Sequence, residues 1–458
     1  MSVMVFTLST SNGNIKEKNT LLIVSEGDGM QSNLNVLLHT TIGDLIRQHR
    51  EEANLSLSQL AHQSGVDKAG ISRIERGETK RPELRTVQLL ADVLGIPYEV
   101  YVSHYIDVEQ RPDVLHDMLM EAIRLAHIAL ISKVVLRFLE SPQKDSYDLI
   151  EQLFHTTINI TNREMKLELL KHIIDFSRNH GIQTYFSKGI LHKYLIERDD
   201  FSKLDSTYHA GKNIIQYENF LSYEEKILLY YKLGVHAYVL RLYKDCIELC
   251  EQVIRNDTTD SFFKAEAFFA LCNSHYYLCD YTRAKHYLEE YSKFSFPNVA
   301  ENVRYMTGSI NGKIGNTELA VTQLESFLER SSEYNFMNVV VALMELYLEK
   351  KDLIAIEKLL SYEMRITQTE IRTPYKRFAL AYFHRLKGDY LIYSKVTITA
   401  FESYIKSACE YIKVSMYSQA FECLGFVTNK AIENGNIELY EDVLQKMNSM
   451  YSMLSKPN

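Results

Sequence analysis

The sequence has few of the residues that interrupt helices or crosslink small folds. Among its 458 residues there are 18 glycines, 7 prolines, 6 cysteines and no tryptophan. Glycine and proline this sparse, without strand-like alternation of apolar and polar residues, exclude a strand-rich fold and favour long helices. The cysteines are scattered and lack a Cys-x-x-Cys spacing, which argues against a disulfide framework in an oxidising compartment.

A metal or redox pair is the alternative for Cys246 and Cys250, which lie one helical turn apart. No histidine with a matching ligand spacing follows them, and cysteine is commonly a small buried apolar residue. We therefore expect neither a metal nor another cofactor.

Long apolar segments are also missing. No stretch approaches the ~20 consecutive apolar residues that a membrane-spanning helix requires. The nearest one, residues 115–139, contains five charged residues and therefore predicts one amphipathic helix. Residues 1–40 contain no apolar core of secretory length. We expect a cytoplasmic protein without a membrane partner.

Recognisable catalytic motifs are absent from the sequence. It has no glycine-rich phosphate loop, no Gly-x-Ser-x-Gly elbow and no His-Glu-x-x-His, and its 15 histidines are scattered. We therefore expect no enzyme. The formal net charge of −8, from 51 basic and 59 acidic residues, also excludes a general polyanion binder. Any affinity for nucleic acid must come from a local basic patch, which residues 41–85 supply.

Two short helical patterns, joined by one glycine, occupy residues 55–82, LSLSQLAHQSGVDKAGISRIERGETKRP. Ser56 is a favourable N-cap for the first pattern, and Gly65 can adopt the positive φ of a tight turn between helices. Asp67 can cap the second helix. Two helices in this arrangement indicate a helix-turn-helix that reads DNA.

The pattern LA…G…IS-x-IE-x-G…P resembles the phage-repressor and Cro type of helix-turn-helix, also called the XRE family, over about residues 41–101, within a predicted DNA-binding domain of residues 41–105. The resemblance implies a five-helix domain whose third helix enters the major groove. It places the DNA contacts at Ser58, Lys68, Ala69, Ser72, Arg73, Arg76, Lys80 and Arg81. It also implies a buried pair of Arg50 with Glu75. Leu57 departs from the family, many of whose members have a phosphate-binding glutamine there.

Composition divides the rest of the chain. Residues 1–40 predict a disordered or non-native extension. Codons for residues 26–28, Glu-Gly-Asp, can spell a purine-rich ribosome-binding sequence, so we hypothesise that translation begins at Met30. The polar run at 106–113 predicts a linker. From 114 to 458 apolar residues recur every three to four positions, which predicts an all-helical region.

A repeat is visible within residues 114–458. Small or core residues that would begin the second helix of a pair recur just above the ~34-residue tetratricopeptide period. They are Cys246, Ala284, Ala320, Ala355 and Ala400. The region resembles degenerate tetratricopeptide repeats, and we expect an all-α protein whose DNA-binding domain is followed by an α-solenoid of helix pairs. Other antiparallel helix pairs of similar length are the alternative.

The register of that resemblance places the first helix of each pair along a concave groove. It predicts that the inward residues are Tyr231, Tyr238, Phe269, Asn273, Tyr276, Tyr277, Asn302, Tyr305, Ser309, Met344 and Tyr347. Asparagine amides can donate to and accept from a peptide backbone, while tyrosine rings supply apolar contact. These residues predict a peptide-binding groove with Asn273 as its main polar contact. Packing between helices is the alternative for several of the tyrosines.

The combination of a repressor-type reader and a helical-repeat region resembles the RRNPP group of bacterial peptide-pheromone receptors. The resemblance implies a homodimer that binds an inverted-repeat operator on double-stranded DNA. It also implies that a short signalling peptide in the groove changes DNA binding, which is the basis of quorum sensing in that group. Two alternatives stay open, namely a repeat scaffold that binds a protein and a regulator of a phosphotransfer partner.

Overall fold

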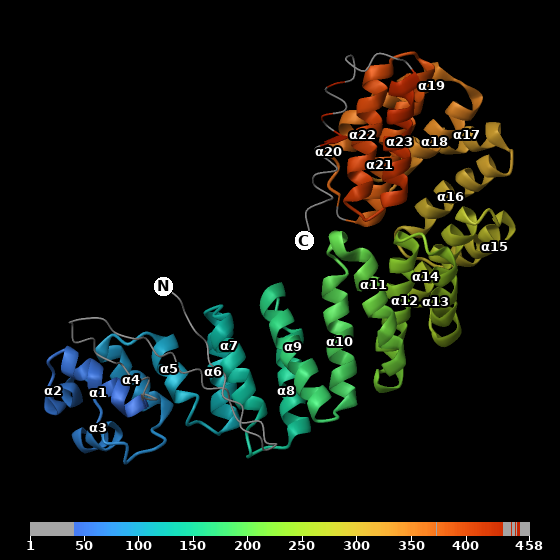
Figure 1. The fold of residues 1–458 in the computed structure, drawn as a ribbon. Helices are drawn as coiled ribbons and strands as arrows, with labels where there is room; N and C mark the ends of the chain where they lie inside the picture. The colour runs from blue at the N-terminus through green and yellow to red at the C-terminus, as the bar shows by residue number, and fades with distance from the viewer. Residues whose placement is uncertain (1–40, 372, 434–440, 442–444, 446, 449–458) are drawn as a thin grey trace, which may run out of the picture. The chain divides into compact units, whose positions relative to one another are not determined.

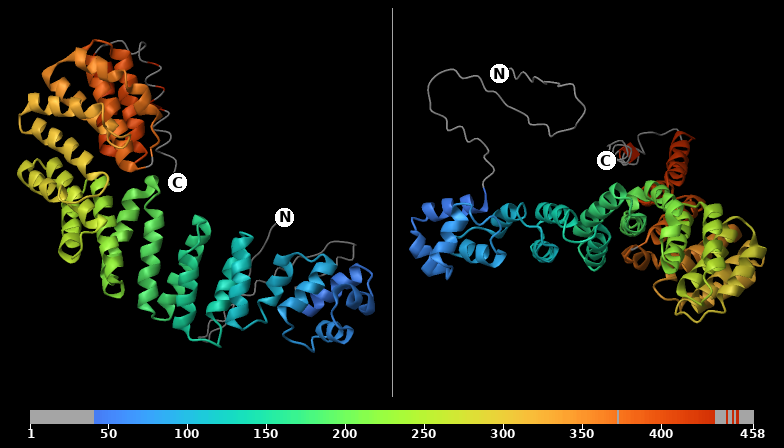
Figure 2. Two further views of the ribbon diagram at one scale, coloured as in Figure 1. Left: turned by 180° about the vertical axis from the view of Figure 1, so that it is seen from behind. Right: turned by 90° about the horizontal axis from the view of Figure 1, so that it is seen from below.

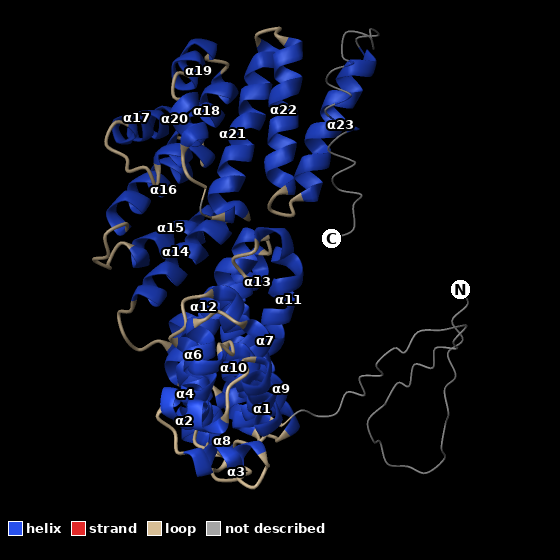
Figure 3. Ribbon diagram, turned by 90° about the vertical axis from the view of Figure 1, so that its left-hand side faces the viewer, coloured by secondary structure: helices blue, strands red, loops and turns tan. Residues whose placement is uncertain are grey.

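The computed structural model describes residues 41–371, 373–433, 441, 445, 447 and 448. All secondary structure in these residues is helical, which confirms the predicted all-α class (Figure 3). The chain divides into two compact units, with the boundary between Tyr105 and Ile106. The predicted extension at residues 1–40, with the alternative start at Met30, lies outside the described residues. Among the described helices, we find none whose length and hydropathy would let it cross a lipid bilayer.

The described part of unit 1 is a bundle of five short helices (Figure 1). They are α1 (Ile42–Glu52), α2 (Leu57–Ser64), α3 (Lys68–Glu75), α4 (Leu84–Leu94) and α5 (Tyr98–Tyr105). The core is made of fully buried apolar side chains, among them Ile46, Leu60, Ile71, Leu90 and Val102. The hydroxyl of Tyr105 donates a hydrogen bond to the carbonyl oxygen of Pro82 over 2.8 Å, so α5 holds the chain between α3 and α4 in place.

Local signals begin and end the helices of unit 1. The hydroxyl of Ser56 accepts from the backbone N–H of Gln59, whose side chain accepts from the N–H of Ser56, so the two residues form a capping box. Asp67 Oδ2 accepts from the N–H of Gly70 at the start of α3. Gly65 ends α2 with a φ of +70°, in the left-handed region that favours glycine. The predicted caps and turn are confirmed.

Unit 2 is a succession of helices, most of which pack on the next one along the chain (Figure 1, Figure 2). Its first half contains α6 (Pro112–Arg124), α7 (Ile128–Leu139), α8 (Ser146–Ile158), α9 (Arg163–Asn179), α10 (Gln183–Glu197), the 3-10 helix Phe201–Lys203, α11 (Leu204–Lys212), the 3-10 helix Asn213–Phe220 and α12 (Tyr223–Val239). Its second half contains α13 (Tyr243–Asn256), α14 (Phe262–Tyr277), α15 (Tyr281–Tyr291), α16 (Val299–Lys313), α17 (Thr317–Leu328), α18 (Phe336–Lys350), α19 (Leu353–Leu360), α20 (Glu363–Gln368), α21 (Pro374–Tyr393), α22 (Thr397–Ile412) and α23 (Tyr417–Glu433).

Paired helices are the repeating element of unit 2, which confirms the predicted solenoid. Each predicted start of a second helix lies in the second member of a pair: Cys246 in α13, Ala284 in α15, Ala320 in α17, Ala355 in α19 and Ala400 in α22. Glycine on the first helix allows a close crossing. A Cβ added at Gly234 would lie 2.7 Å from Sγ of Cys250, and one at Gly308 would lie 2.8 Å from Cγ of Leu324.

Residues 115–139 form two helices, α6 and α7, so the prediction of one amphipathic helix is wrong. Ala126 adopts a φ of +54° and reverses the chain between them. The apolar spacing continues across this turn because both helices bury one face, and the sequence carries no glycine there to mark the break.

The segment predicted as a linker, 106–113, packs against α7. The guanidinium of Arg137 donates to the carbonyl oxygen of Glu109 over 3.1 Å, and the hydroxyl of Ser141 donates to that of Gln110 over 2.6 Å. The segment also overlaps α6, which begins at Pro112. These hydrogen bonds make it part of unit 2.

Five of the turns inside the helix pairs contain a left-handed residue that is not glycine. A φ of +54° to +61° occurs just after the first helix of five pairs, at Ala126, Arg241, Cys279, Lys351 and Lys395. Each such residue costs about 1–2 kcal/mol relative to a right-handed conformation. The pairs therefore carry a repeated backbone strain that close packing of their helices offsets.

Lys351→Gly is expected to stabilise unit 2. Lys351 is exposed and has a φ of +58° after α18, so glycine removes strain without removing a buried contact. Because glycine also makes the unfolded chain more flexible, the free energy of unfolding in urea should rise by only about 0.5–1 kcal/mol. Lys350→Gly, at the last residue of α18, should lower it by about 1 kcal/mol, because glycine is a poor helix former and the ion pair of Lys350 with Glu318 is lost. Equal effects of the two changes would contradict the strain.

Candidate nucleic-acid interface and groove

Helix α3 turns one side to the core of unit 1 and the other to solvent. Ile71, Ile74 and Glu75 are buried. On the opposite side lie the predicted DNA contacts Lys68, Ala69, Arg73 and Arg76, all exposed, with Ser72 half-buried. In the major groove, basic side chains on a free helix face can donate to guanine, and small side chains can contact the thymine methyl.

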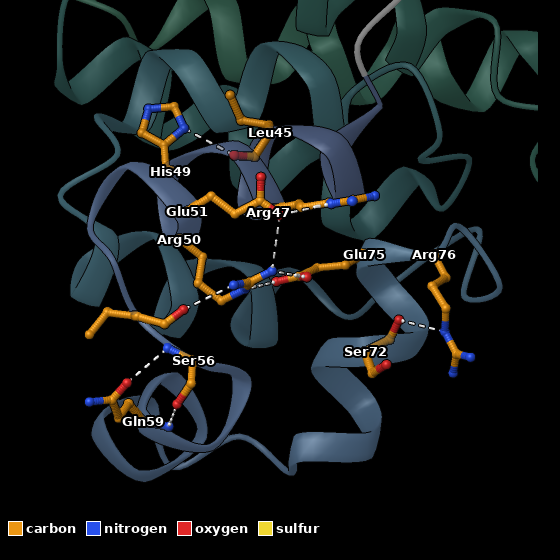
Figure 4. A network of polar contacts seen from close by, with 11 residues as sticks. Leu45, Arg47, His49, Arg50, Glu51, Ser56, Gln59, Ser72, Glu75 and Arg76 are labelled. Atoms are coloured by element: carbon orange, nitrogen blue, oxygen red, sulfur yellow. Dashed lines mark hydrogen bonds and ion pairs between the residues drawn. The ribbon is translucent and has the colours of Figure 1, made fainter.

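Arg50 of α1 and Glu75 of α3 form the predicted buried ion pair (Figure 4). Two guanidinium nitrogens donate to the two carboxylate oxygens over 2.7 and 2.8 Å, and the third donates to the carbonyl oxygen of Leu55 over 2.9 Å. The side chains of Arg50 and Glu75 are 13% and 6% exposed. The hydrogen bond to Glu75 raises the pKa of Arg50. One guanidinium therefore joins three segments, namely α1, the turn that precedes α2, and α3.

A close backbone approach adds to this support. Gly43 of α1 is buried, and a Cβ at this position would overlap the carbonyl oxygen of Ile74 in α3. Only glycine lets the two helices come this near, so the orientation of α3 is fixed by backbone packing as well as by the ion pair.

The remaining predicted DNA contacts surround α3. Ser58 in the first turn of α2 is exposed, as are Lys80 and Arg81 in the loop after α3. The guanidinium of Arg76 donates to the carbonyl oxygen of Ser72 over 3.3 Å (Figure 4). It also pairs with Glu78 at 3.3 Å. The side chain of Arg76 is thus engaged within unit 1.

Two hollows lie on the inner face of unit 2, and both are lined by residues that the sequence places there. The first hollow, between α12, α14 and residues 373–375, has a volume of about 330 Å³ and is lined in part by Tyr231, Tyr238, Phe269 and Asn273. His236 at its wall is 2% exposed, and burial lowers the pKa of this imidazole to about 4. The histidine is therefore neutral at pH 7.

The second hollow lies between α14, α16, α18 and α21 and has a volume of about 360 Å³. Its wall includes the predicted Tyr276, Tyr277, Tyr305 and Ser309. It also carries charge: the cations Arg241, Lys313 and Arg385 stand against the single carboxylate of Glu345. Volumes of this size are those of sites for small organic ligands and short peptide segments.

Aromatic side chains separate the two hollows. Tyr375 of α21 lines both, and its ring centroid lies 6.0 Å from that of Tyr238 in α12. Burial raises the pKa of both phenols well above the usual value. Beside them, the guanidinium carbon of Arg241 lies 4.0 Å above the ring of Phe378. The helix pair that begins with α12 and the pair that begins with α21 therefore contact each other through aromatic rings and the guanidinium of Arg241.

Three predicted groove residues do not line either hollow. Met344 is completely buried in the core between α17, α18 and α21. The hydroxyl of Tyr347 donates to Glu325 of α17, and the amide of Asn302 donates to the hydroxyl of Tyr291 over 3.0 Å. These three assignments are wrong because the helices that carry them are buried on more than one side, so apolar spacing alone does not fix which residues face inward.

The groove also contains residues that the sequence did not suggest. Asn338, Ala342 and Glu345 are the inward residues of α18, and α21 contributes Tyr375, Phe378, Tyr382 and Arg385. The sequence between Ala355 and Ala400 contains the extra helix α20 and the 20-residue helix α21. These helices lengthen the repeat, so its register does not predict which residues of α21 face inward. In the described part of the chain no cluster of histidine, cysteine, aspartate or glutamate could hold a metal ion.

Comparison with known proteins identifies the kind of domain that unit 1 contains. The model of the helix-turn-helix family matches residues 46–101. The transcriptional repressor RghR of Bacillus subtilis (strain 168) is 46% identical over 69 residues, which are 15% of this chain and 51% of RghR. The transcriptional regulator SinR of Bacillus licheniformis is 32% identical over 68 residues, 15% of this chain and 61% of SinR. The chain thus spans about half the length of these relatives, and the match is confined to the DNA-binding region.

Some solved structures are similar over more of the chain. One is PlcR of Bacillus thuringiensis in complex with the peptide PapR7 and DNA. It has 13% sequence identity and a TM-score of 0.25, and the match covers 84% of this chain and 99% of PlcR. The structure of phAimR has 12% identity and a TM-score of 0.38, and covers 88% of this chain and 100% of phAimR. The region that matches the helix-turn-helix family, residues 46–101, extends from α1 into α5 of the five-helix unit 1.

Proposed function

We propose that this chain is a cytoplasmic transcriptional regulator whose binding to operator DNA is controlled by a short signalling peptide, as in quorum sensing. The observation that carries peptide control is the pair of hollows on the inner face of unit 2, lined by tyrosine rings, an asparagine amide and charged side chains. A peptide backbone needs donors and acceptors beside apolar surface, and this wall supplies both.

In the proposed complex with DNA, α3 enters the major groove. Lys68 and Arg73 donate to guanine, Ala69 and Ser72 contact neighbouring bases, and Lys80 and Arg81 bind phosphates. Two copies related by a two-fold axis would place two such helices on an inverted repeat. The support for this arrangement is the exposed face of α3 together with the rigid Arg50–Glu75 connection behind it.

Asn273 is the proposed polar contact for the peptide backbone. Its amide nitrogen donates to the carbonyl oxygen of Phe269 over 2.8 Å, which fixes the side chain in one orientation. The amide oxygen has no hydrogen-bond donor among the described residues, and the residue lines the first hollow. A fixed acceptor at the edge of an aromatic wall suits the N–H of an extended peptide.

The function can be tested with two selections on the full chain. Operator duplexes are first selected from random DNA, and peptides are then selected from a library of short synthetic peptides randomised at every position. We expect retained peptides to change the dissociation constant for the operator by at least about tenfold, a coupling of about 1.4 kcal/mol. A dissociation constant that no retained peptide alters would contradict peptide control, because a ligand must favour one state to act.

Asn273→Ala is expected to weaken the peptide response and to leave DNA binding without peptide unchanged. Loss of one hydrogen bond in a partly buried site corresponds to about 1–2 kcal/mol, or a five- to thirty-fold higher peptide concentration at half effect. The measurement is a peptide titration of operator binding. Asn256→Ala, an exposed asparagine at the end of α13, is the matched control. Identical titrations for the two variants would contradict this role of Asn273.

A further inference from the structure

Glu266 is a carboxylate in the wall of the first hollow. It lies on α14 one helical turn before Phe269 and Ala270 and two turns before Asn273, so all four share the inner face of that helix. The side chain is half-buried, and the rings of Tyr231 and Tyr334 also line this hollow. Glu266 therefore faces the space in which the proposed ligand lies.

This carboxylate has no ionic partner. In the part of the chain that the structure describes, no lysine, arginine or histidine lies within ion-pair distance of Glu266, and its hydrogen bond comes from the hydroxyl of Tyr291 at 3.4 Å. Burial raises the pKa of Glu266. By contrast, Glu345 in the second hollow has Lys313 at 3.1 Å and the hydroxyl of Tyr382 at 2.7 Å.

A second group in the first hollow is also incompletely satisfied. The Nε atom of Arg198 is buried and has no hydrogen-bond acceptor, yet this guanidinium does not pair with Glu266. A buried charge without a partner destabilises the protein by itself, and a ligand that supplies the missing charge recovers that free energy. The first hollow thus contains an unpaired carboxylate at Glu266, which a cationic group would complete, and an unsatisfied donor at Arg198, which a neutral acceptor such as a peptide carbonyl oxygen would complete.

We propose that Glu266 is the subsite for a cationic group of the peptide, either its free N-terminal ammonium or a lysine or arginine side chain. The inference rests on the proposed function, since it names the chemistry of the ligand in the same groove. Tyr231, Phe269 and Tyr334 provide aromatic surfaces beside the carboxylate, and a cation gains further stabilisation from such rings. A carboxylate among rings selects a cation over a neutral polar group.

The test compares four libraries of short randomised synthetic peptides on the full chain. The first has free N-termini, the second is N-acetylated, the third lacks lysine and arginine, and the fourth has both changes. Retained peptides are quantified by mass spectrometry after size-exclusion chromatography. We expect retention from the fourth library to be at least about tenfold lower than from the first, because its peptides bring no cation to the unpaired carboxylate of Glu266. The second and third libraries distinguish the N-terminal ammonium from a side chain.

The variant Glu266→Gln keeps the size of the side chain and its hydrogen bond to Tyr291, and it should abolish the difference between the first and fourth libraries. Glu248→Gln, at an exposed position on α13, should preserve that difference. Equal retention of all four libraries by the unmodified chain would overturn the Glu266 subsite and leave peptide binding intact. Absence of retention from every library would overturn both proposals. The library comparison needs no variant, so it decides even if Glu266→Gln fails to fold.

Discussion

Arg50→Ala is expected to lower the stability of the DNA-binding unit by about 3–5 kcal/mol, because the carboxylate of Glu75 is left buried without its partner. That carboxylate is 6% exposed and accepts two hydrogen bonds from Arg50. The loss is a large part of the total stability of a small domain. Hydrogen exchange of the amides in α1 to α5, followed by mass spectrometry of the intact chain, measures it directly.

The control is Arg47→Ala on the same helix. Arg47 pairs with Glu51 at 3.1 Å, but both side chains are more than half exposed, at 58% and 56%. An exposed pair of this kind contributes about 0–1 kcal/mol. Similar protection factors in the two variants would show that the Arg50–Glu75 pair is not the main connection between α1 and α3.

Arg73→Ala is expected to remove operator selectivity without changing helical content. Arg73 is exposed on the free face of α3, where the guanidinium can donate to both acceptors of a guanine. Loss of such a contact corresponds to about 1–3 kcal/mol, so the selected operator should bind roughly 5- to 150-fold more weakly, while random duplexes bind as before. Competition titrations at one salt concentration measure the ratio.

Two further variants distinguish base reading from general attraction. Lys80→Ala should weaken operator and random DNA equally and reduce the slope of affinity against salt by about 1, as expected for a phosphate contact. Arg85→Ala, exposed on α4 and outside the predicted contacts, should do neither beyond a small electrostatic loss. An undiminished operator preference in Arg73→Ala would contradict the proposed orientation of α3.

The sequence predicted unit 1 in more detail than unit 2, and the reason is physical. Ser56, Gly65 and Asp67 act within one helical turn, so their types alone fix where helices begin and end. The Arg50–Glu75 pair was predicted by resemblance to a family, since no local rule joins residues 25 positions apart. Both kinds of signal were strong here, and the structure confirms both.

The groove was predicted in part, because its inward residues depend on helix rotation. On α12 and α14 one side of each helix faces the hollows, and Tyr238 and Asn273 were assigned correctly to that side. On α18, FMNVVVALMELYLEK, ten of the fifteen residues are buried, so Met344 and Glu345 could not be told apart by apolar spacing.

The contacts of Tyr238 with Tyr375 and of Arg241 with Phe378 join α12 to α21, two helices that lie far apart in the chain. Holding these helices together closes a long loop, and that closure loses conformational entropy which the contacting side chains must offset. A ligand that spans the two hollows acts as a crosslink across that loop. In the proposed complex, part of the binding free energy of such a ligand would offset the entropy lost when α12 and α21 are held together.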